Sequence, residues 1–509
     1  MKKSFWLMVA VFVFWSGFAY SQATRLDSLL AMIANKYQLA GMSVAVIKDS
    51  QVVFSRGYGL RDIARNLPVD ENTKFRIASI SKMVTATAIM QLYEQGLFRL
   101  DDDVSPYLGF QLKNPKFPDQ SITFKMLLSH TSSLRDGSNY NRFLNDTYAK
   151  TPVPALQELL VPGGSYYSAD MFDATRAPAQ SYFQYSNINF GILGTLVEKI
   201  SGERFDRYCI QHIFNPLGMA ASFNVRDLPD INDVAVLYRK SGSTWTPQAD
   251  HYNGVVPPER DLSGYVIGDN GAIFAPQGGL RTSARDLAKF LLVHLQGGRH
   301  QQTRLLNDTT TALMHQSVWR FTGGNGDTYY GIFKNYALGN STTSDLLPGQ
   351  QLIGHPGEAY GLISDLYFST FGNYGIIFIT NGGVWGNGTY SGWYNVEEEV
   401  FKACYGQLNQ LTEVVSVRSA LINGYELQPN CPNPFNSATH IRFRLPHTSV
   451  VSLEIFDISG KQVALLLHRL LPAGGHTIRW DAGQLASGIY LCRLQAGQFV
   501  AARKITLLR

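Results

Sequence analysis

The stretch from Ser79 to Gly96 restricts most strongly how this chain can fold. It holds the only Ser-x-x-Lys sequence of the protein, Ser79 to Lys82, and a run up to Gly96 with apolar residues near every 3.6 positions. The glycine is a typical helix stop. The pattern predicts a helix that begins near Ser79. Residues three apart share a helix face, so the Lys82 amine should reach the Ser79 hydroxyl.

This spacing can build a nucleophile. A serine hydroxyl reacts poorly until a neighbour takes its proton, and a desolvated lysine can be neutral enough to do so. The start of a helix adds a field that favours developing negative charge by roughly 0.3 to 2 kcal/mol. A Ser-x-x-Lys tetrapeptide also arises by chance in a chain of 509 residues, so it needs support from other motifs.

Two further motifs supply that support. Tyr185-Ser-Asn187 and His355-Pro-Gly357 are the only Tyr-x-Asn and His-x-Gly sequences of the chain. Singly they could be a core tyrosine and plain turns. Ser-x-x-Lys, Tyr-x-Asn and a cationic residue-x-Gly, in this order, resemble the β-lactamase and penicillin-binding-protein superfamily of serine hydrolases. The resemblance is greatest to its class C branch of esterases and D-amino-acid peptidases, and it covers about residues 25–405, including the segments 122–134 and 277–287.

The resemblance implies a role for each motif residue. Ser79 would be the nucleophile that forms an acyl-enzyme, Lys82 its proton partner and Tyr185 a second acid or base. Asn187 would orient Lys82 or the acyl group of the substrate. His355 would lie on the strand that lines the site. Whether Lys82 or Tyr185 takes the first proton is left open.

An oxyanion hole is expected from the backbone N–H groups of Ser79 and Glu358, and Gly357 would let the strand approach closely. Loss of one such donor typically costs roughly 2.7 to 4 kcal/mol of transition-state stabilisation. His355 departs from the lysine usual in lactamases, which weakens a specific prediction of penicillin hydrolysis. The loop His130-Thr-Ser-Ser also departs from the usual His-Thr-Ser-Gly, and we interpret His130 as a structural loop residue.

Other chemistries lack their motifs. The chain has no Gly-x-Ser-x-Gly elbow, which argues against an α/β-hydrolase. It has no His-Glu-x-x-His and no closely paired cysteines, so neither a metal nor another cofactor is predicted. The four cysteines are too few for a disulfide scaffold; Cys431 and Cys492 could pair, but the connectivity is open.

Residues 1–23 have a cationic start, an apolar centre and small residues at the end, which is typical of a secretory signal peptide. A membrane anchor is the alternative, although no stretch is long enough for a stable membrane span. The net charge of +5 arises from residue 426 onward, with nine Lys and Arg against four Asp and Glu. No basic cluster suggests nucleic-acid binding.

The C-terminal region differs from the rest of the chain in its residue pattern, which is typical of β-strands. Alternating runs at 440–445, 451–456, 477–480 and 488–494 predict a small β-sandwich. With Pro432-Asn-Pro-Phe-Asn436, Ser487-Gly-Ile-Tyr490 and a basic end, it resembles the sorting domain of the type IX secretion system. That implies passage through the periplasm to the cell surface or the outside, with the secretion machinery as a partner. An Ig-like module is the alternative.

The predicted fold class is α+β, an antiparallel sheet flanked by helices with an inserted helical region, plus a C-terminal all-β sandwich. Helices are expected at 26–37, 190–200, 285–295 and 394–405, and strands at 42–47, 52–55, 362–368 and 374–380, so that both ends of the domain share one sheet. Segments 135–182 and 242–271 are expected to rim the site. The predicted domains are a hydrolase domain at 24–410, a linker at 411–427 and a sorting domain at 428–509.

The predicted function is an exported serine hydrolase that acts on small-molecule, peptide or ester substrates through an acyl-enzyme. A β-lactamase proper and a D-Ala-D-Ala carboxypeptidase are alternatives within the same class. A non-catalytic surface protein that binds peptides or penicillin-like ligands is the alternative from another class. The sequence does not rank these substrates.

Overall fold

A computed structural model describes residues 25–508 except 180, 409–424, 459 and 498. These residues form two compact units, one within Thr24–Leu408 and one within Asn409–Arg509. The predicted signal peptide and residues 411–424 of the predicted linker lie outside the described residues. No helix in the described part of the chain is long and apolar enough to cross a membrane.

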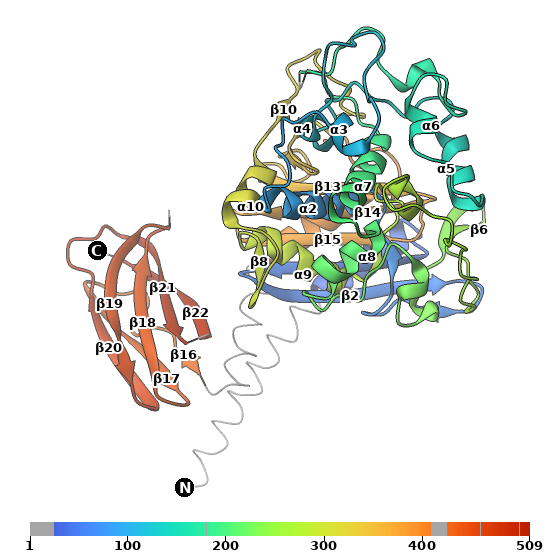
Figure 1. The fold of residues 1–509 in the computed structure, drawn as a ribbon. Helices are drawn as coiled ribbons and strands as arrows, with labels where there is room; N and C mark the ends of the chain where they lie inside the picture. The colour runs from blue at the N-terminus through green and yellow to red at the C-terminus, as the bar shows by residue number, and fades with distance from the viewer. Residues whose placement is uncertain (1–24, 180, 409–424, 459, 498, 509) are drawn as a thin grey trace. The chain divides into compact units, whose positions relative to one another are not determined.

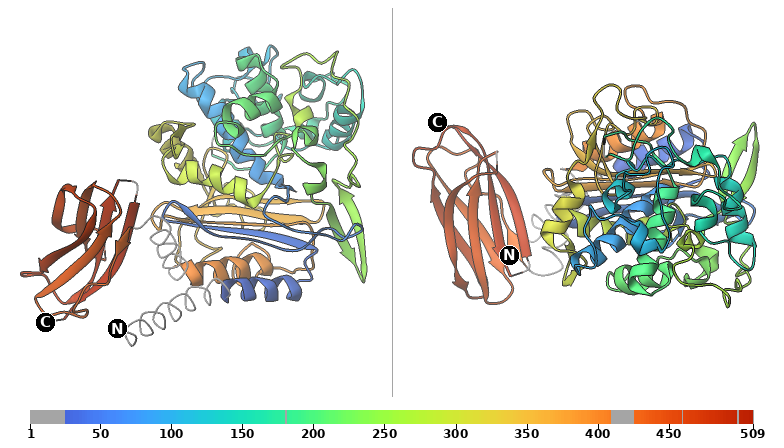
Figure 2. Two further views of the ribbon diagram at one scale, coloured as in Figure 1. Left: turned by 90° about the horizontal axis from the view of Figure 1, so that it is seen from below. Right: turned by 45° about the horizontal axis from the view of Figure 1, so that its top comes forward.

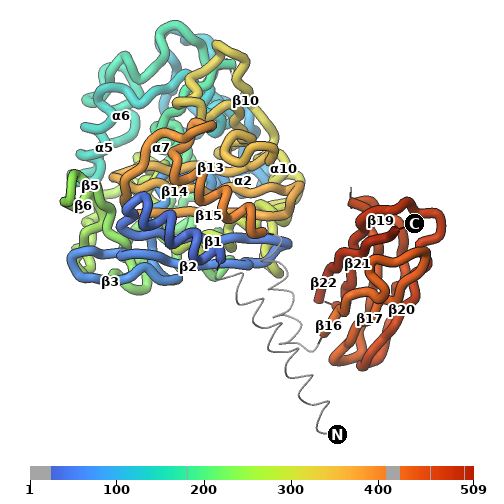
Figure 3. Tube along the Cα trace, turned by 180° about the vertical axis from the view of Figure 1, so that it is seen from behind, coloured from blue at the N-terminus to red at the C-terminus, as the bar shows by residue number. Residues whose placement is uncertain are grey.

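An antiparallel sheet of nine strands forms the centre of the larger unit (Figure 1). Its strands, in spatial order, are β10 (Trp319–Arg320), β11 (Asn335–Tyr336), β12 (Ser341–Thr343), β13 (Leu352–Ala359), β14 (Leu362–Ser369), β15 (Tyr374–Thr380), β1 (Gly41–Lys48), β2 (Gln51–Asp62) and β3 (Leu67–Pro68). The first hairpin therefore joins the last strand, with Met42 opposite Thr380, and the succession β13 to β3 can be followed in Figure 3. This confirms that both ends of the unit share one sheet.

Helices cover both faces of this sheet. Figure 2 shows the helices over residues 25–36 and 395–408 together on one face, and the remaining helices on the other. The latter are α2 (Ser81–Glu94), α3 (Ser105–Leu108), α4 (Phe124–Leu128), α5 (Tyr140–Ala149), α6 (Gln157–Leu160), α7 (Ile188–Ser201), α8 (Phe205–Cys209), α9 (Ala284–Leu295) and α10 (Asp308–His315). The predicted helices at 190–200 and 285–295 correspond to α7 and α9. The predicted α+β class is confirmed.

Two central helices are buried around most of their circumference. Most side chains of α2 and α7 are buried, and these two helices pack against each other above the sheet. A helix that is apolar around most of its surface is stable only inside a core. The start of α2, with the Ser-x-x-Lys sequence, is therefore held by packing from several sides.

The segment 135–182 has more structure than the rim loop expected from its composition. It forms α5 and α6, and Tyr140 and Phe143 of α5 are buried in the main core. These two residues lie three positions apart on one helix face, so they bury together. The segment 242–271 contains β6 (Thr244–Ala249), which pairs with β5 (Leu237–Ser241).

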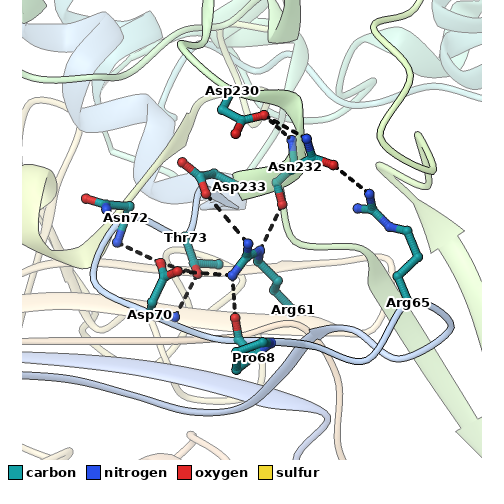
Figure 4. Close-up of polar contacts among 9 residues, drawn as sticks. All are labelled: Arg61, Arg65, Pro68, Asp70, Asn72, Thr73, Asp230, Asn232 and Asp233. Carbon is teal, nitrogen blue, oxygen red and sulfur yellow. Dashed lines mark hydrogen bonds and ion pairs between the residues drawn. The ribbon is translucent and has the colours of Figure 1, made fainter.

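Arg61, at the end of β2, links the segment that leads to Ser79 to the loop that contains Asn232 (Figure 4). Its guanidinium donates to the carbonyl oxygens of Pro68 at 2.5 Å and Asn232 at 2.8 Å, and pairs with Asp70 at 3.1 Å. Beyond it, the short strand β4 (Phe75–Arg76) pairs with β7 (Arg281–Thr282). The short strands β8 (Arg299–His300) and β9 (Thr303–Arg304) form a separate hairpin.

The smaller unit is a sandwich of two antiparallel sheets. One contains β16 (Glu426–Leu427), β17 (Ala438–Leu445) and β20 (Gly474–Asp481), and the other β19 (Gln462–Leu471), β18 (Ser449–Phe456), β21 (Gly488–Ala496) and β22 (Phe499–Leu507). The predicted all-β class is confirmed. The basic C-terminal run is a strand, β22, whose Ile505 and Leu507 point into the core.

The cysteine pairing that the sequence allowed does not form. Cys431 and Cys492 are both free thiols; Cys431 is exposed and Cys492 is buried on β21. Cys209 and Cys404 are also free and buried.

Candidate active site

Ser79 lies in a single 3₁₀ turn, η1 (Ala78–Ile80), that runs directly into α2. The residue before it, Ala78, has a φ of 43°. A left-handed conformation costs a non-glycine residue about 1 to 2 kcal/mol, so surrounding contacts must hold this turn. Ala78 is 2% exposed, which supplies the packing. The turn leaves the Ser79 side chain partly exposed at the start of the helix.

Lys82 reaches back to Ser79, as the spacing predicted. Its Nζ lies 3.0 Å from Ser79 Oγ, 2.9 Å from Asn187 Oδ1 and 2.8 Å from the carbonyl oxygen of Gln277. Two of these three partners, a carbonyl and an amide oxygen, can only accept hydrogen bonds. A neutral amine would give its two N–H groups to them and direct its lone pair at Ser79. The geometry therefore suits proton transfer from Ser79 to Lys82.

The electrostatics of Lys82 agree with that geometry. The side chain is fully buried. Burial lowers the pKa of Lys82 to about 7, and the Asp136 carboxylate opposes this shift. A pKa near neutrality is the value at which a general base works best in neutral solution.

Asn187, the last residue before α7, is oriented by a group outside the three motifs. Its Nδ2 donates to Asp136 Oδ2 at 2.8 Å, so its Oδ1 faces Lys82. Asp136 also accepts from the backbone N–H groups of Asn187 and Ile188 and from the Ser186 hydroxyl. It thereby caps the start of α7. Sequence reasoning missed Asp136, although it lies two residues beyond the segment 122–134 that carried the resemblance.

Tyr185 lies over the amine of Lys82. The Lys82 Nζ is 4.9 Å from the centre of the Tyr185 ring, and the ring stacks on Phe333 at 5.0 Å. Burial raises the pKa of the Tyr185 phenol well above its usual value, and a hydrogen bond with Ser79 opposes the shift. The phenol therefore stays protonated near neutral pH.

His355 lies on β13, next to the other motifs, but as a neutral ring. It is fully buried, its Nε2 is 3.0 Å from Tyr336 Oη and its Nδ1 is 2.5 Å from the carbonyl oxygen of Pro356. Burial lowers the pKa of His355 to about 3, and the charge of Lys82 adds to this effect. The third motif therefore presents a desolvated, neutral ring at the position where lactamases usually have a lysine.

At Gly357 the backbone of β13 lies directly against the turn that holds Ser79. A Cβ at this position would lie 2.4 Å from Ser364 Oγ, 2.6 Å from the carbonyl oxygen of Ile77 and 3.1 Å from the Ser79 nitrogen. Only glycine fits this contact. β12 pairs with β13 only as far as Gly354, so residues 355–359 have one strand edge without a ladder partner. Alternate N–H groups on such an edge are left for other acceptors.

Glu358 follows Gly357 on the same strand. Its side chain is exposed and accepts from Tyr394 Oη at 3.2 and 3.3 Å. The expected contribution of this residue is its backbone N–H, which does not depend on the carboxylate.

The segment 276–280 fastens the start of α2 and was not assigned to the site from the sequence. Thr85 donates to the carbonyl oxygen of Pro276 at 2.8 Å, and the backbone N–H of Leu280 donates to Ser81 Oγ at 3.2 Å. Together with the contact of Lys82 to Gln277, these bonds fix the segment along one side of the helix. Backbone carbonyls carry no sequence signal, so this role could not be read in advance.

His130 lies in a loop, as interpreted from the sequence. Its Nδ1 accepts from the backbone N–H of Ser186 at 3.2 Å and lies 3.1 Å from Asn189 Nδ2. Its ring is 4.5 Å from that of Tyr185. The His130 ring therefore packs against Tyr185 and binds the backbone of the next residue, Ser186.

The structure thus brings Ser79, Lys82, Tyr185 and Asn187 into direct contact and places Gly357 against the same turn. Within the described residues, no group of three His, Cys, Asp or Glu side chains could hold a metal ion.

Both units resemble known protein families. The family model described as "Beta-lactamase" matches residues 26–400, and the one described as "Secretion system C-terminal sorting domain" matches residues 431–507. "Protein flp" of Staphylococcus aureus is 24% identical over 365 residues, which cover 70% of this chain. The chain spans 62% of the length of that relative.

Two solved structures share the fold. The D-amino acid amidase from Ochrobactrum anthropi has a TM-score of 0.54 at 19% identity, covering 76% of this chain and 99% of that one. EstCE1, described as a hydrolase with promiscuous acyltransferase activity, has a TM-score of 0.56 at 20% identity, with the same coverage of both chains.

Proposed function

The chain belongs to the β-lactamase family, and on this premise we propose that it is an exported serine hydrolase that forms an acyl-enzyme on Ser79 with ester or amide substrates. The observation that carries the proposal is the buried Lys82 amine, 3.0 Å from Ser79 Oγ and bound on its other sides by two acceptors. The family match covers the region that contains all three motifs.

In the proposed acylation step, neutral Lys82 takes the proton of Ser79 as Oγ attacks the carbonyl carbon of the substrate. The new oxyanion would be held by the backbone N–H groups of Ser79 and Glu358. Tyr185, with its raised pKa, would act as the proton donor that delivers a proton to the leaving alcohol or amine and recovers one from Lys82. The proposal thus assigns the first proton transfer to Lys82 rather than to Tyr185.

Deacylation would follow the same path in reverse. A water molecule gives a proton to Lys82 and attacks the acyl carbon; the second tetrahedral intermediate then collapses to release the acid while Lys82 returns the proton to Ser79 Oγ. Asn187 would hold the Lys82 amine in place through both steps. Atoms and protons balance without a cofactor.

The neutral state of His355 supports esters and amides over β-lactams. A cationic third motif can attract the carboxylate that penicillins carry, whereas a buried neutral histidine offers no such charge. The amidase and EstCE1 are hydrolases in the same fold, which agrees with this substrate class.

Labelling with a fluorophosphonate tests the proposal directly. The mature protein should form a covalent adduct at Ser79, Ser79→Ala should not, and Ser263→Ala, an exposed loop serine, should label as the wild type does. Equal labelling of the wild type and Ser79→Ala would support the non-catalytic binding protein instead. A panel of nitrophenyl esters, D-amino-acid amides, D-Ala-D-Ala peptides and nitrocefin would then rank the substrates.

The C-terminal unit contains a type IX secretion sorting domain, which points to secretion. We propose that residues 1–23 direct the chain to the periplasm and that the sorting domain then carries it to the cell surface or the medium. Deletion of residues 428–509 should leave active enzyme in the periplasm. Active enzyme in the medium after this deletion would contradict the proposal.

A further inference from the structure

Ser364 is a buried hydroxyl that none of the motifs includes. It lies on β14 directly opposite Gly357 of β13 and is 0% exposed. Its Oγ donates to the carbonyl oxygen of Ile77 at 3.0 Å and lies 3.4 Å from the carbonyl oxygen of Gly357. One side chain therefore contacts the chain two residues before Ser79 and the peptide group that carries the Glu358 nitrogen.

The Ile77 carbonyl belongs to the peptide group that enters the strained turn. Ala78 has a φ of 43°, and this unusual backbone angle sets the direction of the next N–H group, that of Ser79. The Ile77 nitrogen donates to the carbonyl oxygen of Leu280 at 3.0 Å. Ser364 holds the carbonyl end of the same residue, so the backbone before Ala78 is fixed from both sides.

Three polar atoms lie so close to the Cα of Gly357 that no side chain would fit there. The position of a Cβ on Gly357 lies within 3.1 Å of Ser364 Oγ, the Ile77 oxygen and the Ser79 nitrogen. A rotation of the Ile77 carbonyl would therefore move the Ser79 N–H relative to β13. The spacing of the two proposed oxyanion donors depends on this contact.

We propose that Ser364 is a positioning residue that sets the separation and direction of the Ser79 and Glu358 N–H groups. This inference rests on the proposed function, because it assigns the two groups to oxyanion stabilisation. Ser364 does not touch the reacting atoms. It acts through the Ile77 carbonyl, which it draws toward the sheet.

The test compares Ser364→Ala with Ser341→Ala. Ser341 is an equally buried serine in the same sheet, and its Oγ donates to the carbonyl oxygen of Gly354 on β13 at 3.1 Å. Each variant loses a buried hydrogen bond from a serine hydroxyl to a backbone carbonyl, so their loss of stability should be similar. Kinetic constants for the best ester, the inhibition constant of an arylboronic acid and the melting temperature are measured for both.

Ser364→Ala should lower kcat about tenfold or more, since a complete loss of one oxyanion donor costs roughly 100- to 1,000-fold. KM should stay within about threefold, because the ground state does not use the oxyanion hole fully. The boronic acid should bind more weakly by the factor by which kcat/KM falls. Ser341→Ala should keep kcat within about twofold at a similar melting temperature.

A similar loss of kcat in both variants, or no loss in Ser364→Ala, would overturn the inference while an active wild type upholds the proposed function. If the wild type neither labels nor turns over any ester or amide, the proposed function fails by itself. Crystal structures of the wild type and Ser364→Ala then still decide the structural claim. An unchanged Ala78 backbone and Ser79 nitrogen in the variant would refute it.

Discussion

Asp136→Asn should move the pH dependence of the reaction toward acid. In the proposed mechanism Lys82 must lose its proton before it can accept that of Ser79, and burial lowers the pKa of Lys82 to about 7. The Asp136 carboxylate opposes this shift because it stabilises the charged ammonium. Removing that carboxylate charge lowers the pKa of Lys82 further. More of the neutral base is then present at any given acidic pH.

The size of the shift follows from the contacts. Asp136 and Lys82 are joined through the Asn187 amide by two hydrogen bonds of 2.8 and 2.9 Å. Unit charges about 7 Å apart interact by about 1 to 2 kcal/mol at effective dielectric constants of about 20 to 40. Asp136 is exposed, so the lower value applies. One pKa unit corresponds to about 1.4 kcal/mol, so we expect a shift slightly below one unit.

The assay is the pH profile of kcat/KM for one ester. The wild type should lose activity below an apparent pKa of about 7, and Asp136→Asn should lose it at a pH lower by slightly less than one unit. High salt should reduce the difference between the two profiles. The variant also loses an acceptor for Asn187, so its maximal rate should fall, but the position of the acid limb reports only the proton affinity.

Asp170→Asn is the matched control. Asp170 is an exposed carboxylate of the same insertion and accepts from the backbone of Ser138, but it does not contribute to the shift of Lys82. Its acid limb should coincide with that of the wild type. An acid limb that stays in place in Asp136→Asn, or that moves to higher pH, would refute Lys82 as the titrating base.

Three further outcomes are expected. Gly357→Ala should lower kcat by about 100-fold or more, because a Cβ there would lie 2.4 Å from Ser364 Oγ, whereas Gly264→Ala, with no atom within 4 Å of the new Cβ, should be neutral in the same assay. Asp250→Asn should lower the free energy of unfolding in urea by about 3 kcal/mol or more, since it leaves the buried cations of Arg76 and Arg281 without their shared anion. The pKa of Asp250 is held below its usual value in the folded state, so this contribution should fade as the pH drops below about 4; stability that is unchanged in acid would contradict it. Iodoacetamide should alkylate all four cysteines of the unfolded protein without prior reduction, and a mass that shows a disulfide would contradict the free thiols.

The sequence carried the fold well because its elements are strongly patterned. The residue pattern of the run after Ser79 fits only a helix, and the apolar runs near both ends of the larger unit fit only strands. The three-residue spacing on that helix placed Lys82 beside Ser79. The helices inside the 135–182 insertion were missed because Tyr140 and Phe143 stand among polar residues, so their common face was not recognised. The last strand of the smaller unit was missed because the adjacent basic residues Arg503 and Lys504 interrupt its apolar alternation.

Three properties of the site depend on tertiary contacts that a motif does not encode. The protonation of His355 depends on its burial beside Tyr336, which lowers the pKa of the ring and keeps it neutral even in mild acid. The direction of the Asn187 amide depends on Asp136, some fifty residues earlier in the chain. The left-handed backbone at Ala78 depends on the strand that carries Ser364.

The residues that define the place of the proposed reaction are therefore different from those that set its dependence on pH. In the proposed mechanism Ser79, Lys82 and Tyr185 are the groups that exchange a proton, and their place in the three motifs brings them together in this fold. The proton affinity of Lys82 is instead set by burial and by Asp136, and its lone pair is directed by the Asn187 amide and the Gln277 carbonyl. Two relatives with identical motifs can therefore work best at different pH values, because the residues that tune the base lie outside the motifs.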